Sequence, residues 1–362
     1  MGNQISPTDT FEEVLEHGRR DLSTARDEYA ALEQTETVPS ALVEALSDLE
    51  RELDELDQTL DVEEADLELA RQTVRRVGVL EEVFTALRER QRTVVEADVS
   101  RLDHHVSAIA KLGRKHGAGP ELEGDIDSVE RQCSMLDALV SKGRHEKVVT
   151  NDRVSPGEVD AAVRAVDADL ATRVPDDSRA ETYVSITERL LDEIHDVLGS
   201  LGQENEERTA YSSDLGLVKD RLEAAEEASG DDDGARAAKT ARTALEGALI
   251  LHYSTARAHA DQRVAQALAD AVADSDLVVD CDVERCVLRG DAETLLTAIT
   301  AAVGTEVELS TSERLRQLLT EHDGSVRRTA RATDFDVATI LDHVERLYDD
   351  GQIADLQVTF DR

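Results

Sequence analysis

Apolar residues recur in alternating steps of three and four through most of the first 270 residues. This spacing places them on one face of an α-helix. Four stretches repeat it cleanly, each for about three heptads, and turn signals separate them. The four seams are Phe11, Leu15, Gly18, Leu22, Ala25, Tyr29 and Leu32; Leu42, Leu46, Leu49, Leu53, Leu56 and Leu60; Val95, Val99, Leu102, Val106 and Ile109; and Leu122, Ile126, Val129, Cys133, Leu136 and Val140. Short seams of this kind favour helices that fold back on one another over one long rod.

A single glycine interrupts the helical pattern between Val62 and Leu112, which predicts one helix of about 75 Å at a rise of about 1.5 Å per residue. Further helical patterns cover Glu158–Val174 and the alanine-rich stretch Ala235–Ala273. The fold class is therefore mainly α. We expect a helical coiled-coil bundle over residues 1–145 and a second helical segment over residues 156–274.

The composition changes after residue 274. Short runs rich in valine and leucine, with partial alternation, are typical of strands, and Asp291–Val303 has the pattern of a helix. The expected strands cover 277–283, 286–288 and 305–309. These elements predict a small α+β element over residues 275–310.

The last fifty residues follow a recognisable order of elements. The pattern predicts an amphipathic helix at Ser312–His322, a short helix at Val326–Thr333, a third helix that begins at the N-cap Asp336, and a strand at Ile353–Phe360 after Gly351. This order resembles the winged-helix variant of the helix-turn-helix family. Thr339–Ile353 is especially similar to that family's third helix and its exit into the wing. The resemblance implies a winged-helix domain over residues 311–362.

In that family the second helix meets the DNA backbone and the third faces the base edges. The resemblance therefore implies six candidate DNA-binding residues: Ser325, Arg327, Arg328, Arg331, Thr339 and His343. The segment nevertheless carries seven basic residues against eleven acidic ones, so non-specific attraction to phosphates should be poor. Winged helices also dock proteins, and a fold alone does not decide between the two. We expect a transcriptional or chromosome-associated DNA-binding factor; the alternative is an assembly scaffold whose winged helix docks a partner protein.

The charge balance is strongly acidic, with 80 acidic and 40 basic side chains and a formal net charge of −40. The basic residues are 34 arginines and only 6 lysines. Such a surface resembles that of proteins from salt-in halophilic archaea, where multimolar salt shortens the Debye length to about 3 Å. The alternative is an acidic coiled-coil protein of an ordinary cytoplasm.

Two segments reverse this charge locally. Residues 71–92 contain six arginines and three glutamates, and Lys111–His116 adds three basic side chains. Clusters of this kind contact phosphates or an acidic partner. The alternative is that they form ion pairs with the acidic helices beside them.

Motifs for chemistry are sparse. The closest metal-ligand spacings are Cys281 with Cys286, His252 with His259, and the adjacent His104 and His105. Each pair lacks a third ligand at a suitable spacing, and adjacent helical residues point about 100° apart. The chain also lacks the glycine-rich phosphate-binding motifs. We therefore predict no enzyme activity, catalytic residue, metal, cofactor or small-molecule substrate.

The expected partners are macromolecules. DNA is the first, a docked protein is the second, and the heptads suggest self-association through the coiled coil. An odd number of cysteines fits a reducing compartment, and no apolar stretch reaches the roughly 18 residues of a membrane span. We accordingly expect a cytoplasmic protein that makes no membrane contact.

Overall fold

A computed structural model describes residues 9–34, 38–58, 64–151, 153–275 and 277–304. Within these ranges the chain forms eleven α-helices and no strands. The helices are α1 (Phe11–Glu33), α2 (Ser40–Asp57), α3 (Glu64–His116), α4 (Pro120–Ser141), α5 (His145–Val149), α6 (Pro156–Arg173), α7 (Asp176–Ser200), α8 (Glu206–Gly230), α9 (Gly234–Ser275), α10 (Val283–Arg289) and α11 (Ala292–Gly304). The chain divides into two compact units, residues 1–304 and 305–362. Everything described below belongs to the first unit.

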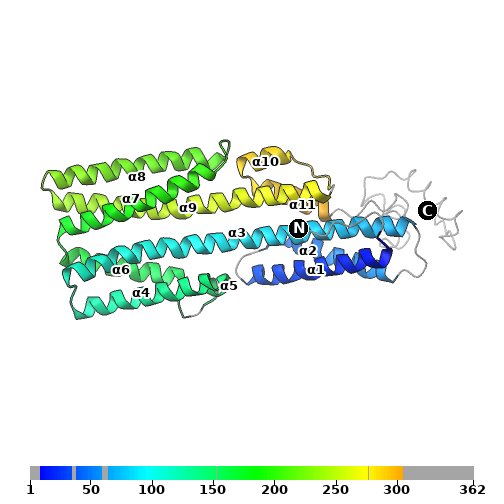
Figure 1. The fold of residues 1–362 in the computed structure, drawn as a ribbon, viewed down its shortest axis with the longest axis horizontal. Coiled ribbons are helices and arrows are strands. Elements are labelled where there is room, and N and C mark those ends of the chain that lie inside the picture. Colours follow the sequence, from blue (N-terminus) through cyan, green and yellow to red (C-terminus); the bar gives the residue numbers. More distant parts are fainter. Residues whose placement is uncertain (1–8, 35–37, 59–63, 152, 276, 305–362) are drawn as a thin grey trace, which may run out of the picture. The chain divides into compact units, whose positions relative to one another are not determined.

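Two long helices organise the first unit. Helix α3 has 53 residues and α9 has 42, and they pack side by side over much of their length (Figure 1). Helices α4–α8 surround one end of this pair, while α1, α2, α10 and α11 surround the other. The predicted uninterrupted helix over 62–112 is confirmed from Glu64 onwards, where this described range begins, and it extends four residues further, to His116.

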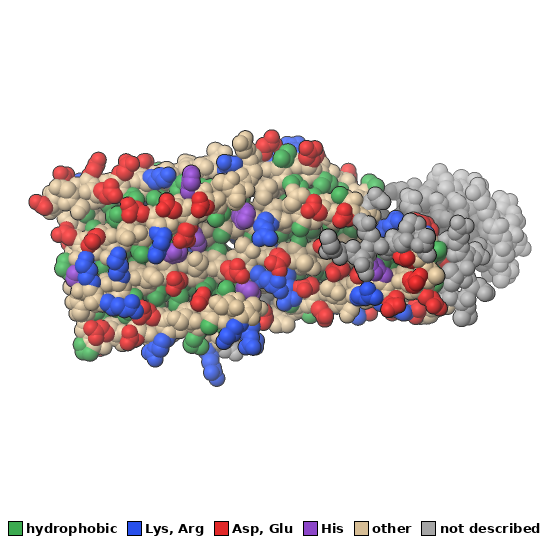
Figure 2. All heavy atoms as spheres, viewed as in Figure 1, with side chains coloured by type: hydrophobic (Ala, Val, Ile, Leu, Met, Phe, Trp, Pro, Cys, Tyr) green, Lys and Arg blue, Asp and Glu red, His purple; other side chains and the backbone are tan. Residues whose placement is uncertain are grey.

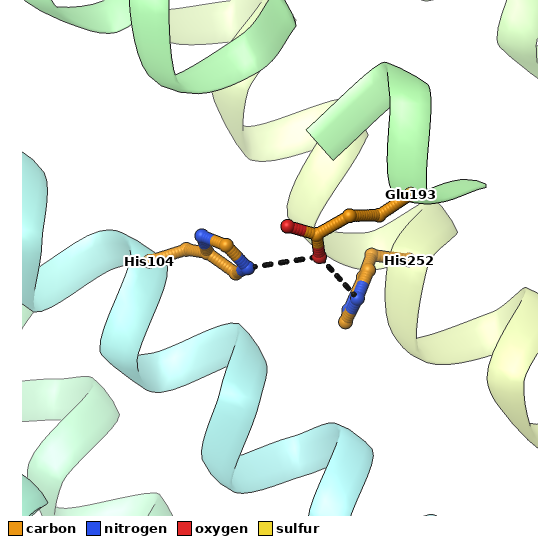
Figure 3. Close-up of side chains that lie close together, drawn as sticks. All are labelled: His104, Glu193 and His252. Carbon is orange, nitrogen blue, oxygen red and sulfur yellow. Dashed lines mark hydrogen bonds and ion pairs between the residues drawn. The ribbon is translucent and has the colours of Figure 1, made fainter. Parts of the chain in front are cut away.

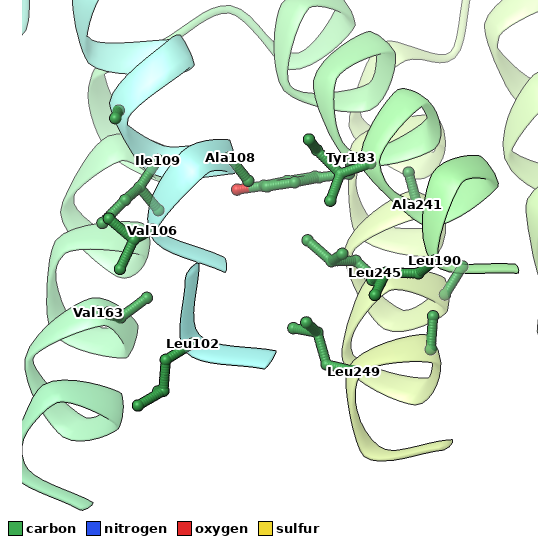
Figure 4. Packing of buried hydrophobic residues seen from close by; sticks show 14 of the residues in the cluster. Leu102, Val106, Ala108, Ile109, Val163, Tyr183, Leu190, Ala241, Leu245 and Leu249 are labelled. Carbon is green, nitrogen blue, oxygen red and sulfur yellow. The ribbon is translucent and has the colours of Figure 1, made fainter. Parts of the chain in front are cut away.

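The larger of two apolar cores lies where α4–α8 enclose α3 and α9. It contains α3 residues from Val95 to Leu112 and α9 residues from Ala237 to Ala258. Figure 4 shows Tyr183 of α7 among the aliphatic side chains of this core. Six alanines of α9 are buried here, and their small side chains allow neighbouring helices to approach closely: Ala237, Ala238, Ala241, Ala244, Ala248 and Ala258.

The second core joins α1 and α2 to the other halves of the same two helices. It contains α3 residues from Ala70 to Ala86 and α9 residues from Val264 to Val272, together with α11. Between the two cores, Arg90 of α3 forms an ion pair with Asp261 of α9. The junction of the cores is therefore polar, although both long helices run through it without a break.

The heptad seams predicted from the sequence are confirmed as core stripes. Leu42, Leu46, Leu49, Leu53 and Leu56 are all buried along α2, while Leu60 lies outside the described residues. The stripes of α1, α3 and α4 are buried too, except that Phe11, Tyr29 and Val140 are only partly buried. Gly18 belongs to the α1 stripe because α1 lies close to α3: a Cβ at this position would lie 2.6 Å from Cγ2 of Val74. The seams pack against one another within the chain, which is the bundle geometry expected from their short length.

Local capping signals place several helix ends. Helices α1 and α6 begin with complete capping boxes, Thr10 with Glu13 and Ser155 with Glu158, which satisfy backbone N–H groups that lack helical partners. Helix α10 ends at Gly290, whose φ of +71° suits glycine.

The predicted strands at 277–283 and 286–288 are wrong. Residues 286–288 lie in α10, which begins where the Asp282 side chain accepts a hydrogen bond from the Arg285 N–H. The alternation at 277–283 is real: Leu277, Val279 and Cys281 pack against the second core, while Val278 is 89% exposed. Among the described residues no strand lies beside this segment, so it does not belong to a sheet. Its side chains alternate between buried and exposed because an extended chain crosses the surface of the core.

The predicted helix at 291–303 is confirmed as α11. The strand expected at 305–309 and the winged helix expected over 311–362 lie outside the described residues, and the proposed domain boundaries stay predictions. None of the helices in the described ranges has the length and apolarity needed to span a membrane.

An acidic cluster between α1 and α3 leads to a pH-dependence prediction. Burial, with Asp21, Glu82 and Glu28 nearby, raises the pKa of Glu81 to about 7. Ionised Glu81 therefore destabilises the native state at pH 8. As the pH falls from above 7 to 4.5, the ordinary pKa of a glutamate, the native state takes up a proton at Glu81 and the protein becomes more stable. Glu81→Gln should stabilise the protein at pH 8 by about 1 kcal/mol, a figure reduced for the partial exposure of the side chain.

The measurement is urea unfolding of the parent and the variant at pH 5 and pH 8. The stabilisation should be present at pH 8 and nearly absent at pH 5, because Glu81 is already protonated there. Glu223→Gln, at an exposed glutamate of α8 outside this acidic cluster, is the control. An equal gain at both pH values would contradict the assignment.

Candidate functional site

The six candidate DNA-binding residues (Ser325, Arg327, Arg328, Arg331, Thr339 and His343) all lie outside the described residues. The other segments marked by the sequence lie in the first unit, and their surroundings are known.

The arginine-rich stretch of α3 is engaged in ion pairs. Arg88 contacts Glu28 of α1 at 2.6 Å, and Arg90 contacts Asp261 of α9. Arg71 and Arg92 contact glutamates of their own helix, while Arg75 is exposed. Ion pairing within the chain therefore accounts for most of this stretch, and the pairs of Arg76, Arg88 and Arg90 join α3 to neighbouring helices.

Arg76 has a different surrounding from the others. Its side chain is 7% exposed. Nε and Nη2 donate hydrogen bonds to the carbonyl oxygen of Val303 at 2.9 and 2.6 Å, and Nη1 donates to Oε2 of Glu52 at 2.8 Å. One guanidinium thus satisfies the C-terminal end of α11 and anchors it to α2 and α3.

The basic segment at 111–116 is also paired. Lys115 contacts Glu181 of α7 at 2.7 Å, and Arg114 contacts Glu130 of α4. Across the face of the unit shown in Figure 2, acidic and basic side chains are interspersed. The two reversals of charge that the sequence shows therefore serve mainly to hold helices together.

A cluster of three side chains joins the long helices in the larger core. Oε2 of Glu193 on α7 lies 3.1 Å from Nε2 of His104 on α3 and 3.3 Å from Nε2 of His252 on α9 (Figure 3). The two imidazole rings meet edge to face, with centroids 5.7 Å apart. Each histidine residue is 9% exposed, whereas the Glu193 side chain is 40% exposed. The cluster is thus buried at its two imidazoles and open to solvent beside the carboxylate.

Hydrogen bonding indicates the tautomer of His104. Arg189 donates a long hydrogen bond of 3.4 Å to Nδ1 of His104, so Nδ1 carries a lone pair. Nε2 then carries the proton and donates it to the Glu193 carboxylate. Burial lowers the pKa of His252, and the nearby His104 lowers it further. The geometry is that of two neutral imidazoles and one carboxylate around a common point.

This cluster is the one group among the described side chains whose His, Cys, Asp or Glu atoms converge as three metal ligands would, all within 4.8 Å of one another. In the sequence, His104 stands beside His105 and His252 lies seven residues from His259, and no spacing points to Glu193. No local signal could have found it, because the three residues lie on three helices far apart in the chain.

A second polar network is buried at Asp167 and Tyr183, whereas its third member, Arg242, has a side chain that is 33% exposed. Asp167 of α6 is 1% exposed and accepts a hydrogen bond from the hydroxyl of Tyr183, which is fully buried on α7. Nε of Arg242 on α9 lies 2.9 Å from the other Asp167 oxygen, as an ion pair without an in-line hydrogen bond. Burial, and then Asp167, raise the pKa of Tyr183. With both oxygens of the carboxylate engaged, the network is a structural element.

A hollow of about 730 Å³ opens beside the junction of the two cores. Its charged lining consists of Arg90, Arg257, Arg289, Glu207, Asp261, Asp291 and Glu293. Three basic and four acidic groups produce no field of one sign, and Arg90 and Asp261 are already paired with each other. The hollow therefore has no evident preference for an anionic or a cationic ligand.

Comparison of the chain with family models, with curated proteins and with solved structures finds no match. The described part of the chain is a helical protein with two polar networks between its helices, one around Glu193 and one around Asp167.

Proposed function

We propose that this chain is a non-enzymatic assembly scaffold, in which the helical unit supports a C-terminal segment that docks a partner protein. The observation that carries the proposal is the internal use of basic charge. Apart from Arg75, the arginines of residues 71–92 contact acidic groups of the same chain. An acidic surface with its basic groups paired in this way attracts DNA poorly.

DNA binding through residues 311–362 is the second candidate, as a transcriptional or chromosome-associated function. Its support is the winged-helix-like order of elements that the sequence predicts and the closely spaced Arg327, Arg328 and Arg331. Contacts with phosphates through these arginines would have to overcome the net acidity of the same segment.

One assay separates the two candidates. Retention on duplex DNA is measured for the full-length protein and for Arg327→Glu/Arg328→Glu, both in molar KCl. A scaffold predicts that the parent is not retained, or that the double substitution leaves its retention unchanged. DNA retention by the parent that falls at least about tenfold in the variant would establish DNA binding and overturn the scaffold proposal. A Thr339 or His343 substitution would then change sequence preference.

Self-association is a separate part of the proposal. Because the heptad seams are buried within the chain, association between copies must use other surfaces. Exposed apolar side chains are present at Met135, Val149, Leu217 and Ile250. Light scattering on the full-length protein in the same buffer reports the mass directly. A dimer or larger species supports a scaffold that assembles with itself, whereas a monomer limits docking to other proteins.

A further inference from the structure

We propose that His104, Glu193 and His252 bind a divalent transition-metal ion, of which Zn²⁺ is the best match, and that the ion links α3, α7 and α9. The donor set of two imidazoles and one carboxylate is typical of zinc bound by three protein ligands with a fourth, open position. This inference concerns the helical unit and is independent of the proposed docking function.

The spacing of the ligand atoms fits such an ion. Metal–ligand bonds of about 2.0–2.1 Å in a tetrahedron put neighbouring ligand atoms about 3.3 Å apart. Oε2 of Glu193 lies 3.1 and 3.3 Å from the Nε2 atoms of His104 and His252. One ligand atom from each of the three residues lies within 4.8 Å of the other two. Small rotations of the side chains would therefore bring all three ligands to one ion.

The surroundings fit the same interpretation. Three helices that pack on one another hold the ligands, so the positions of the two buried imidazoles are already determined when the ion arrives. Glu193 lies at the exposed side of the cluster, because its side chain is 40% exposed. That side offers a path of entry and room for a water molecule as the fourth ligand. Two neutral imidazoles and one carboxylate leave a divalent ion with a single positive charge, which this acidic protein tolerates.

One neighbour opposes the ion. When Nε2 of His104 binds a metal, its proton moves to Nδ1, where Arg189 now donates a hydrogen bond. The Arg189 donor must then turn away, and its positive charge also repels the ion. Arg189 is exposed and its contact of 3.4 Å is long, so the side chain can move into solvent. Arg189→Ala should therefore bind the ion several-fold more tightly than the parent.

The experiment titrates the metal-free full-length protein with Zn²⁺ in molar KCl against a chromophoric chelator. Molar salt weakens binding of Zn²⁺ to the many surface carboxylates. His104→Ala, His252→Ala and Glu193→Gln should each lose at least about tenfold in affinity, since even partners outside the ligand set contribute that much in metal sites. His259→Ala, seven residues from His252 on α9, is the matched control and should bind as the parent does.

Two further readouts separate metal binding from damage to the fold. Glu193→Gln keeps a hydrogen-bond acceptor, and circular dichroism identifies any variant that fails to fold. Co²⁺ should produce the visible absorption of a tetrahedral site in the parent and in His259→Ala, and not in Glu193→Gln. A hundredfold excess of Zn²⁺ over its dissociation constant should raise the melting temperature by about 5 °C in these two proteins only.

Equal Zn²⁺ affinities for the parent, His252→Ala and folded Glu193→Gln would overturn the proposal, as would the absence of the cobalt absorption in the parent. In either case the three side chains form a hydrogen-bonded network and no metal site.

Discussion

Replacing Arg242 by alanine should lower the free energy of unfolding by about 4 kcal/mol, because it leaves the Asp167 carboxylate buried without its countercharge. Asp167 is 1% exposed and Arg242 lies 2.9 Å from it. The carboxylate would retain the Tyr183 hydroxyl as a donor, which does not balance its charge. Urea unfolding of the full-length protein in molar KCl measures the effect.

The order of effects within the network is a sharper test. Tyr183→Phe removes one hydrogen bond and keeps the ion pair, so it should cost only about 1–2 kcal/mol. The double variant Arg242→Ala/Asp167→Ala should be more stable than Arg242→Ala alone, because it removes the unpaired buried charge. Arg236→Ala, at an exposed arginine of the same helix, should change stability by less than about 0.5 kcal/mol. A double variant less stable than Arg242→Ala would contradict the electrostatic explanation.

The sequence predicted the helices well because each core stripe is a local property. The seam from Leu42 to Leu56 and the uninterrupted pattern of α3 depend on residues three and four positions apart, and both agree with the structure. Prediction failed at 277–289, where the local pattern supports two structures. Alternating burial at Leu277 and Val279 is the same for a strand and for a chain crossing a core surface. The following residues form helix α10 because Asp282 caps its N-terminus.

The candidate metal site could not be predicted, because its geometry depends on tertiary packing. His104 and Glu193 are 89 positions apart, and only the packing of α3, α7 and α9 brings the ligand atoms together. The polar partners of the arginine-rich stretch were likewise left open by the sequence. Phosphate contact and ion pairing require different partners for each arginine side chain. The composition of the stretch does not show which residues of other helices lie next to it.

Arg76 shows most clearly what the sequence left open, because its partners are a carbonyl oxygen of α11 and a glutamate of α2. It leads to the second large prediction. Arg76→Met keeps much of the apolar volume but removes the donors to the Val303 carbonyl oxygen and to Glu52. Burial already raises the pKa of Glu52, and Arg76 opposes that shift, so the carboxylate would lose its main stabilising neighbour. The expected loss in the free energy of unfolding is about 3 kcal/mol.

The adjacent Arg75 provides a matched control, because it is exposed on the same turn of α3. Arg75→Met should change stability by less than about 0.5 kcal/mol. Arg76→Lys should fall between the two, since an ammonium keeps the charge but cannot reproduce the planar set of three hydrogen bonds. Hydrogen exchange distinguishes local from global effects: amides of α11 should lose protection in Arg76→Met at denaturant concentrations where α7 remains protected. Equal protection of α11 in the Arg75 and Arg76 variants would show that the guanidinium does not anchor this helix, and that the apolar contacts of Leu295, Ile299 and Val303 are sufficient.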